Sequence, residues 1–131
     1  MSVFVDTNVL VRHLTGDPPD QAARATRFLA DTETILLPDL IVAELVYVLE
    51  TVYEAPRPQI AGAVRSVLAF PEIHAVDVEL LLRAVEVYEL DRLDFAEAYL
   101  VATAERSGVG AIASFDRSID RVSTVRRIEP A

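Results

Sequence analysis

The chain has 131 residues, a length that fits one compact domain with a buried core and leaves no room for a second. It contains no cysteine, which excludes disulfides and thiol-ligated zinc, and its two histidines lack the spacing of a metal-binding pair, so any metal would be held by oxygen atoms. The net charge of −9 is unfavourable for a nucleic-acid-binding protein, because basic side chains supply most non-specific affinity for phosphates.

The distribution of hydrophobic residues indicates where in the cell the protein is found. Charged residues interrupt every apolar run well before the roughly 20 residues that would span a bilayer. The first six residues show neither a basic region nor a long apolar stretch, so no secretory signal or transit peptide is visible. We therefore expect a cytoplasmic protein with no membrane association.

The first half of the chain alternates short apolar strands with amphipathic helices. Strands are expected at 3–5, where a β-branched and aromatic run ends at Asp6, and at 34–37. Turn residues such as Gly16 and Pro18 separate the helices. The ranges expected to be helical are 7–14, 19–30, 38–53 and 59–69, the last two forming a hairpin.

The second half continues the alternation. It predicts strands at 73–76 and 110–114, a weaker strand at 125–128, and helices at 78–90 and 94–106. Strands separated by helices of this length pair in parallel, because a right-handed crossover needs such a connection. The pattern therefore predicts a single α/β domain over 1–131, with a parallel sheet of four to five strands flanked by helices.

Two aspartates follow strands of the predicted sheet directly. In an open α/β sheet, ligands bind beyond the carboxyl ends of the strands, and Asp6 and Asp116 both occupy such positions. The simpler interpretation is that Asp6 caps the next helix and that Asp116 forms a turn. Either residue alone is ordinary.

Glu44 is the third acid of interest. It is expected to share a helix face with the apolar residues Ile41, Leu45 and Val48, which would direct its carboxylate toward the core. An unpaired buried carboxylate costs several kcal/mol, so it needs a metal, a hydrogen bond or a nearby arginine.

Asp94 and Glu97 are three residues apart at a helix start, so their side chains project from the same side of the first turn. The pair also reads as a capping box, with Asp94 at the N-cap and Glu97 at the third helical position. Capping alone does not explain why Glu97 shares a face with the apolar Leu100, Val101 and Ala104. The two roles are compatible.

The five acids together indicate more than any one of them. Four elements are expected to direct carboxylates toward one edge of the sheet, and like charges so gathered cannot all stay ionised without a cation. Oxygen ligands without cysteine or a histidine pair favour Mg²⁺ or Mn²⁺. Two such ions about 3.5–4 Å apart would suit phosphodiester hydrolysis.

The acids lie within recognisable motifs. These are Val5-Asp6-Thr7-Asn8-Val9-Leu10, Ala43-Glu44-Leu45, Leu93-Asp94-Phe95-Ala96-Glu97-Ala98-Tyr99-Leu100 and Ser114-Phe115-Asp116. Their order and spacing, from Val3 to about Val122, resemble a PIN domain of the VapC toxin type. The combination is far more specific than any single motif.

The resemblance implies a three-layer α/β/α fold, Mg²⁺-dependent endoribonuclease activity on RNA, a homodimer and a cognate VapB-like antitoxin. By position, Asp6, Glu44 and Asp116 match the first, second and fourth acids of the family. The third acid is usually an aspartate, and its register falls on Glu97, which is a departure. Asp94 is the nearby alternative, so which of the two binds metal stays open.

Several further residues follow from the same comparison. Thr7, Asn8 and Ser114 are expected to orient the carboxylates. The last 15 residues carry four arginines against two acids, and among these Arg117 and Arg121 are candidates for holding flanking phosphates; ordinary solubilising charge is the alternative.

Two competing functions remain. A non-catalytic PIN-like module that binds RNA or a partner would accommodate glutamate at position 97. A phosphoryl-transfer domain of the response-regulator type also places acids at strand ends, but it needs a lysine near its site and this chain has none.

Overall fold

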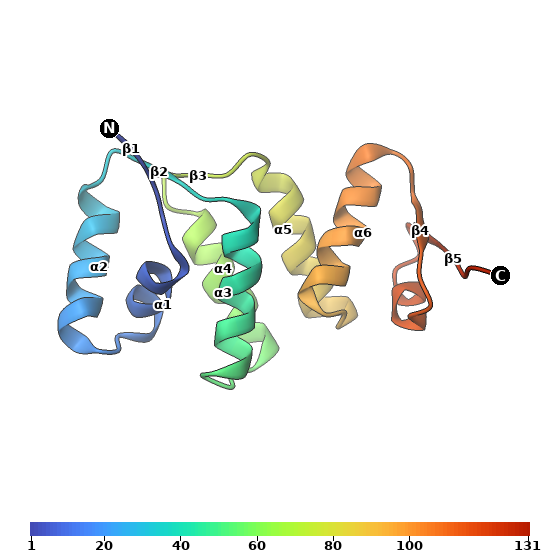
Figure 1. Cartoon of the computed structure of the whole chain (residues 1–131), viewed down its shortest axis with the longest axis horizontal. Coiled ribbons are helices and arrows are strands. Elements are labelled where there is room, and N and C mark those ends of the chain that lie inside the picture. The colour runs from blue at the N-terminus through green and yellow to red at the C-terminus, as the bar shows by residue number, and fades with distance from the viewer. The chain divides into compact units, whose positions relative to one another are not determined.

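The computed structural model describes residues 1–131, which form two compact units, 1–78 and 79–131 (Figure 1). The first unit contains β1 (Ser2–Phe4), α1 (Thr7–Thr15), α2 (Pro19–Asp31), β2 (Thr34–Leu36), α3 (Asp39–Thr51), α4 (Arg57–Leu68) and β3 (Ile73–His74). The second contains α5 (Val78–Glu86), a π-helical segment (Val87–Asp91), α6 (Phe95–Ser107), β4 (Ala111–Ala113), a 3₁₀ helix (Arg117–Arg121) and β5 (Arg126–Ile128).

The first unit is built on a three-stranded parallel sheet in the order β1-β2-β3. Val3 is paired with Ile35, and Ile35 in turn with Ile73, so apolar residues face one another across the strands. The ladder extends one residue beyond β1, since the amide of Val5 donates to the carbonyl of Leu36 at 3.1 Å. The first strand thus ends directly before Asp6.

The helices of the first unit bury one face each. Helix α1 packs against α2 and α3, and α3 packs against α4. Leu10, Leu29 and Ile60 are fully buried, and Gly16 ends α1 in the left-handed conformation that favours glycine. The predicted hairpin of α3 and α4 is confirmed, although α4 begins two residues early because Pro58 fits within its first turn.

The second unit gathers around α6, which packs against the π-helical segment and β4. The ring of Tyr88, buried in the π-helical segment, meets that of Phe95 edge to face at 6.0 Å between centroids. The segment ends at Arg92, which has a positive φ of 60°. The sequence predicted one regular helix over 78–90, and the wider π turn was not foreseen.

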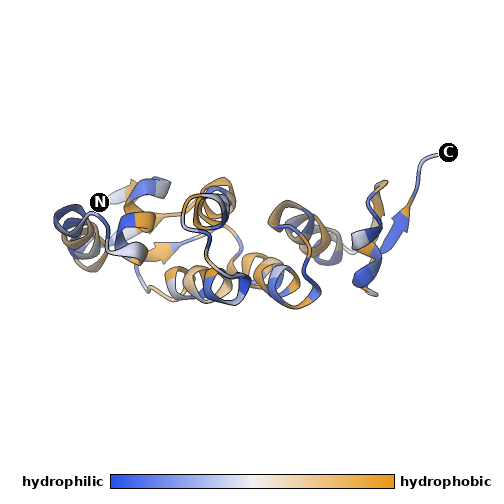
Figure 2. Ribbon diagram, turned by 90° about the horizontal axis from the view of Figure 1, so that it is seen from below, coloured by the Kyte–Doolittle hydropathy of each residue, from blue (hydrophilic) through white to orange (hydrophobic).

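Strand β5 pairs in parallel with β4, with Ile112 opposite Arg127. This confirms the weak strand predicted at 125–128. Its two arginines make it the hydrophilic strand that leads to the C-terminus in Figure 2. The guanidinium of Arg127 donates to Asp120, to Glu129 and to the carbonyl of Ser114.

The predicted α/β class with parallel strands is confirmed. All five strands pair in parallel, three in the first unit and two in the second. The helices show apolar and polar sides in Figure 2, as their spacing predicted. None of the helices is both long and apolar enough to cross a membrane.

A forked ion pair ties α5 to α6. The Nε and Nη2 atoms of Arg83 donate to the two carboxylate oxygens of Glu105 at 2.8 and 2.9 Å. Thr124 donates to the same carboxylate from the segment before β5. The hydrogen bond from Arg83 is the main reason why the pKa of Glu105 lies below its usual 4.5.

This ion pair predicts how the stability of the protein depends on pH. Because the folded-state pKa of Glu105 is lowered, its contribution is present above about pH 4.5 and is lost as the pH falls through the folded value. We expect Glu105→Gln to lower the free energy of unfolding at pH 7 by about 1 kcal/mol and to flatten its acid dependence. Urea unfolding at pH 7 and below pH 4 measures both effects.

The matched control is Glu79→Gln, because Glu79 pairs with Arg106 through a single exposed contact of 3.2 Å. Exposed pairs contribute about 0–1 kcal/mol, so this change should be smaller. Equal losses from the two variants would show that the fork on Arg83 has no special role in stability.

Candidate functional site

Asp6 lies at the junction between β1 and α1. It is the N-cap of α1, and its Oδ1 accepts a hydrogen bond from the amide of Thr7 at 2.7 Å. The side chain of Asp6 is exposed, whereas Thr7 beside it is only 3% exposed. Asp6 therefore does cap α1, and the cap uses one of its two carboxylate oxygens.

Thr7 was expected to orient neighbouring carboxylates. Its hydroxyl Oγ1 is buried and has no hydrogen-bond partner. Buried polar groups are almost always hydrogen-bonded, because leaving one without a partner costs about 1–3 kcal/mol. This atom marks a place where a polar ligand or an ion would be stabilised.

The expected orientation of Glu44 was wrong. The buried face of α3 carries Val42, Leu45, Val46 and Leu49, and Glu44 is exposed. The error has a physical reason, since apolar residues surround nearly the whole of this helix and define no unique stripe. Glu44 therefore needs no buried counter-charge.

The exposed side chain of Glu44 lies near Asp6. The two carboxylates line one cavity of about 250 Å³ together with Thr7. We call it the Asp6 pocket. Its remaining lining residues are Asn8, Val11, Arg12, Val48, Val52 and Tyr53.

The second unit brings three acids together. Asp94 is the N-cap of α6, and its Oδ1 accepts from the amide of Glu97 at 2.8 Å, which confirms that half of the predicted capping box. The carboxyl of Glu97 lies near those of Asp116 and Asp94, and both affect its pKa. Asp116 also caps the 3₁₀ helix, accepting from the amide of Ser118 at 2.9 Å.

The electrostatics of this trio follow from its geometry. Partial burial, hydrogen bonds with Asp116 and Asp94 and the charges of both raise the pKa of Glu97 to about 7. The hydrogen bond from Ser118 is the main reason why the pKa of Asp116 is lowered instead, with Glu97 and Arg121 adding to the effect. At neutral pH Glu97 is therefore only partly ionised where no cation is bound.

The other predicted residues are divided between the two units. Asn8 is exposed and lines the Asp6 pocket, and Ser114 accepts a hydrogen bond from the amide of Asp116 at 2.9 Å. Arg117 and Arg121 are both exposed on the 3₁₀ helix, where Arg121 donates to the carbonyl of Arg92 at 3.0 Å.

One residue of this cluster was not foreseen. The hydroxyl of Ser118 donates to the carboxylate of Glu97 at 3.4 Å, while its amide binds Asp116. A serine two residues after an aspartate is a common turn pattern, and this pattern is the sign in the sequence that Ser118 contacts Asp116. No three histidine or acidic side chains converge closely enough to form a complete metal-binding group.

Comparison with known proteins identifies the family. The family model described as the PIN domain matches residues 3–125. No curated protein matches significantly.

Among matching solved structures is that of VapC20 from Mycobacterium tuberculosis, described as a Sarcin-Ricin loop cleaving toxin. The two share 19% identity over 90% of this chain and 92% of that one, with a TM-score of 0.44. The assignment rests on the family model, which matches both units over nearly their whole length. The chain belongs to the PIN domain family.

Proposed function

We propose that this protein is a Mg²⁺- or Mn²⁺-dependent endoribonuclease that uses Asp6, Glu44, Glu97, Asp116 and Asp94 to bind metal and cleave RNA. The observation that carries the proposal is that none of the five acids forms a salt bridge, although the chain has 12 arginines. Two gather in the first unit and three in the second. Carboxylates so grouped favour a bound cation.

The donor atoms present fit Mg²⁺ or Mn²⁺. Both ions prefer oxygen ligands, and the Asp6 pocket is lined by two carboxylate residues and by Thr7, whose hydroxyl is buried and unpartnered. The second unit adds a trio in which partial burial and the neighbouring carboxyl groups of Asp116 and Asp94 raise the pKa of Glu97 to about 7. Glu97 must be ionised before it can ligate a metal ion.

The metal, when bound, would supply positive charge to the scissile phosphate and an activated water. The chain's own residues would fix the carboxylates. The amide of Thr7 holds Oδ1 of Asp6, and the amide of Ser118 holds Oδ1 of Asp116. Such fixed hydrogen bonds orient ligands and so strengthen metal binding. Arg117 and Arg121 would hold flanking phosphates of the RNA.

The resemblance to VapC toxins extends the proposal to biology. We infer a toxin that acts in the cytoplasm as a homodimer and is inhibited by a VapB-like antitoxin. Helix α3 supports a protein partner, because Leu40 and Tyr47 on its surface are 75% and 63% exposed.

A non-catalytic PIN-like module is the alternative. It is favoured by the glutamate at position 97 and by the absence of a complete metal-binding group of three side chains. Such a protein would bind RNA or a partner without cleaving it, and divalent ions would not alter its thermal stability.

The central test is cleavage of a mixed RNA pool. We expect purified protein to cut with Mg²⁺ or Mn²⁺ and not with EDTA, and Asp6→Asn to lower the rate by roughly 100-fold or more, because one charged ligand is lost. Asparagine still accepts the hydrogen bond from Thr7, so the cap and the fold are kept. Gel analysis of the products measures the rate.

Asp31→Asn is the matched control, since Asp31 is an exposed acid of the same unit that lines none of the described pockets. It should cleave like the unaltered protein. Cutting that survives both EDTA and Asp6→Asn contradicts the proposal, and folded protein that neither cuts nor gains thermal stability with Mn²⁺ supports the binding module.

A second test concerns the third acid. Asp94 caps its helix as Asp6 and Asp116 cap theirs, but Glu97 is the residue in the register of the family's third acid. We therefore expect Glu97→Gln to lower cleavage by about 100-fold and Asp94→Asn by about tenfold or less. Initial rates at saturating Mn²⁺, with melting temperatures as a control for folding, measure the difference. The reverse order of effects would make Asp94 the ligand.

A further inference from the structure

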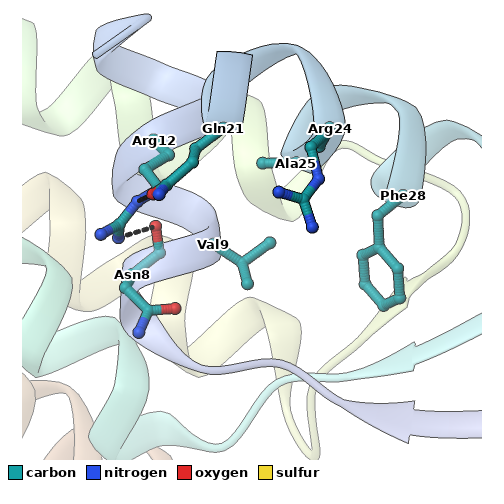
Figure 3. A pocket seen from close by; sticks show the side chains of 7 residues that line it. All are labelled: Asn8, Val9, Arg12, Gln21, Arg24, Ala25 and Phe28. Carbon is teal, nitrogen blue, oxygen red and sulfur yellow. Dashed lines mark hydrogen bonds between the residues drawn. The ribbon is translucent and has the colours of Figure 1, made fainter. Parts of the chain in front are cut away.

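A second pocket lies between α1 and α2, with a volume of about 420 Å³ (Figure 3). We call it the α1–α2 groove. Helix α1 contributes Asn8, Val9 and Arg12, and helix α2 contributes Gln21, Arg24, Ala25 and Phe28. None of the five acids of the proposed function lines it.

Arg12 is held in place at one side of this groove. Its Nε donates to Oε1 of Gln21, and its Nη1 donates to the carbonyl of Asn8 at 3.2 Å. Both partners also line the groove, as Figure 3 shows. No carboxylate pairs with Arg12, so its charge is positioned but not neutralised.

Arg24 supplies a second charge. It is exposed and makes no hydrogen bond or ion pair within the protein. In Figure 3 its guanidinium extends from α2 toward Val9, and the ring of Phe28 extends from the same helix four residues later. The groove thus has an unpaired cation beside a half-buried aromatic ring.

The charge of the lining is opposite to that of the chain. The protein carries a net charge of −9, yet this groove contains two guanidinium groups and no acidic residue. Two such cations favour a shared anion, and arginine matches the geometry of phosphate. The ring of Phe28 offers the flat apolar surface on which a nucleic-acid base stacks.

The α1–α2 groove also adjoins the Asp6 pocket. Asn8 and Arg12 line both cavities, so the two cavities are neighbours along α1. An acidic peptide would satisfy the arginines equally well, but it would not use the aromatic ring or the continuity with Asp6. These two features favour RNA.

We propose that the α1–α2 groove binds a nucleotide of single-stranded RNA next to the cleaved bond, with the phosphate on Arg12 and Arg24 and the base against Phe28. The proposal rests on the nuclease function above, to which it adds a specific place for the substrate. Neither contact depends on the identity of the base, because the arginines bind the phosphate and stacking on Phe28 tolerates every base.

The test is the binding of a fluorescein-labelled single-stranded RNA 12-mer of mixed sequence, followed by anisotropy in EDTA so that no cleavage occurs. Arg24→Gln should weaken binding about three- to tenfold and lower the slope of log Kd against log salt by roughly 0.7, because one phosphate contact is lost. Phe28→Leu should weaken binding by a similar factor and leave the slope unchanged, because stacking releases no counterions.

Arg27→Gln is the matched control. Arg27 lies on the same helix, is exposed and does not line the groove, so the change removes the same charge at a neighbouring place. Arg27→Gln should change Kd less than twofold, because the affinity for RNA depends on contacts within the groove. Melting temperatures of the three variants verify that they are folded.

Equal effects of Arg24→Gln and Arg27→Gln would overturn the proposal, because general charge would then explain the binding. Unchanged RNA binding in Arg24→Gln and Phe28→Leu would also overturn the proposal. If these variants then lose affinity for a labelled glutamate-rich peptide, the groove binds a protein partner. Failure here leaves metal-dependent cleavage and its loss in Asp6→Asn unaffected. Failure of the nuclease proposal is seen separately, in the cleavage assay of the unaltered protein.

Discussion

The hydrogen bond from the amide of Val5 to the carbonyl of Leu36 determines where the first strand stops. One residue later the backbone leaves the ladder, and the side chain of Asp6 satisfies the amide of Thr7, which has no backbone partner at the start of α1. The buried Thr7 follows directly, and Asp6 and Thr7 line the same pocket. The Asp6 pocket is thus a consequence of where backbone pairing ends.

Helix capping and metal binding are complementary uses of the same residues. Asp6, Asp94 and Asp116 each accept a hydrogen bond from a backbone amide at the start of a helix. Such amides favour negative charge and fix one oxygen of each carboxylate. A cap therefore orients an acid, which is what a metal ligand requires. Helix capping and the proposed metal binding therefore use the same carboxylates of these aspartates.

The sequence predicted the alternation of strands and helices well, because turn residues such as Gly16 and Pro38 delimit each element. It failed for the face of α3, where apolar residues on nearly all sides leave the orientation of Glu44 to tertiary packing. It also missed the π turn at 87–91, since an extra residue in a helical turn leaves no periodic mark. The role of Ser118 depends on a contact with Glu97, 21 residues earlier in the chain, that no local pattern encodes.

The π turn has a consequence for how such a chain tolerates insertions and deletions. Each residue of an α-helix turns the chain by about 100° and advances it by about 1.5 Å. A deletion within a regular α-helix therefore rotates everything that follows it, whereas the π turn at Val87–Asp91 holds one extra residue, and losing it would restore a regular helical turn and keep the cap at Asp94 in register. A one-residue deletion should accordingly be tolerated better in this segment than within a regular helix such as α6.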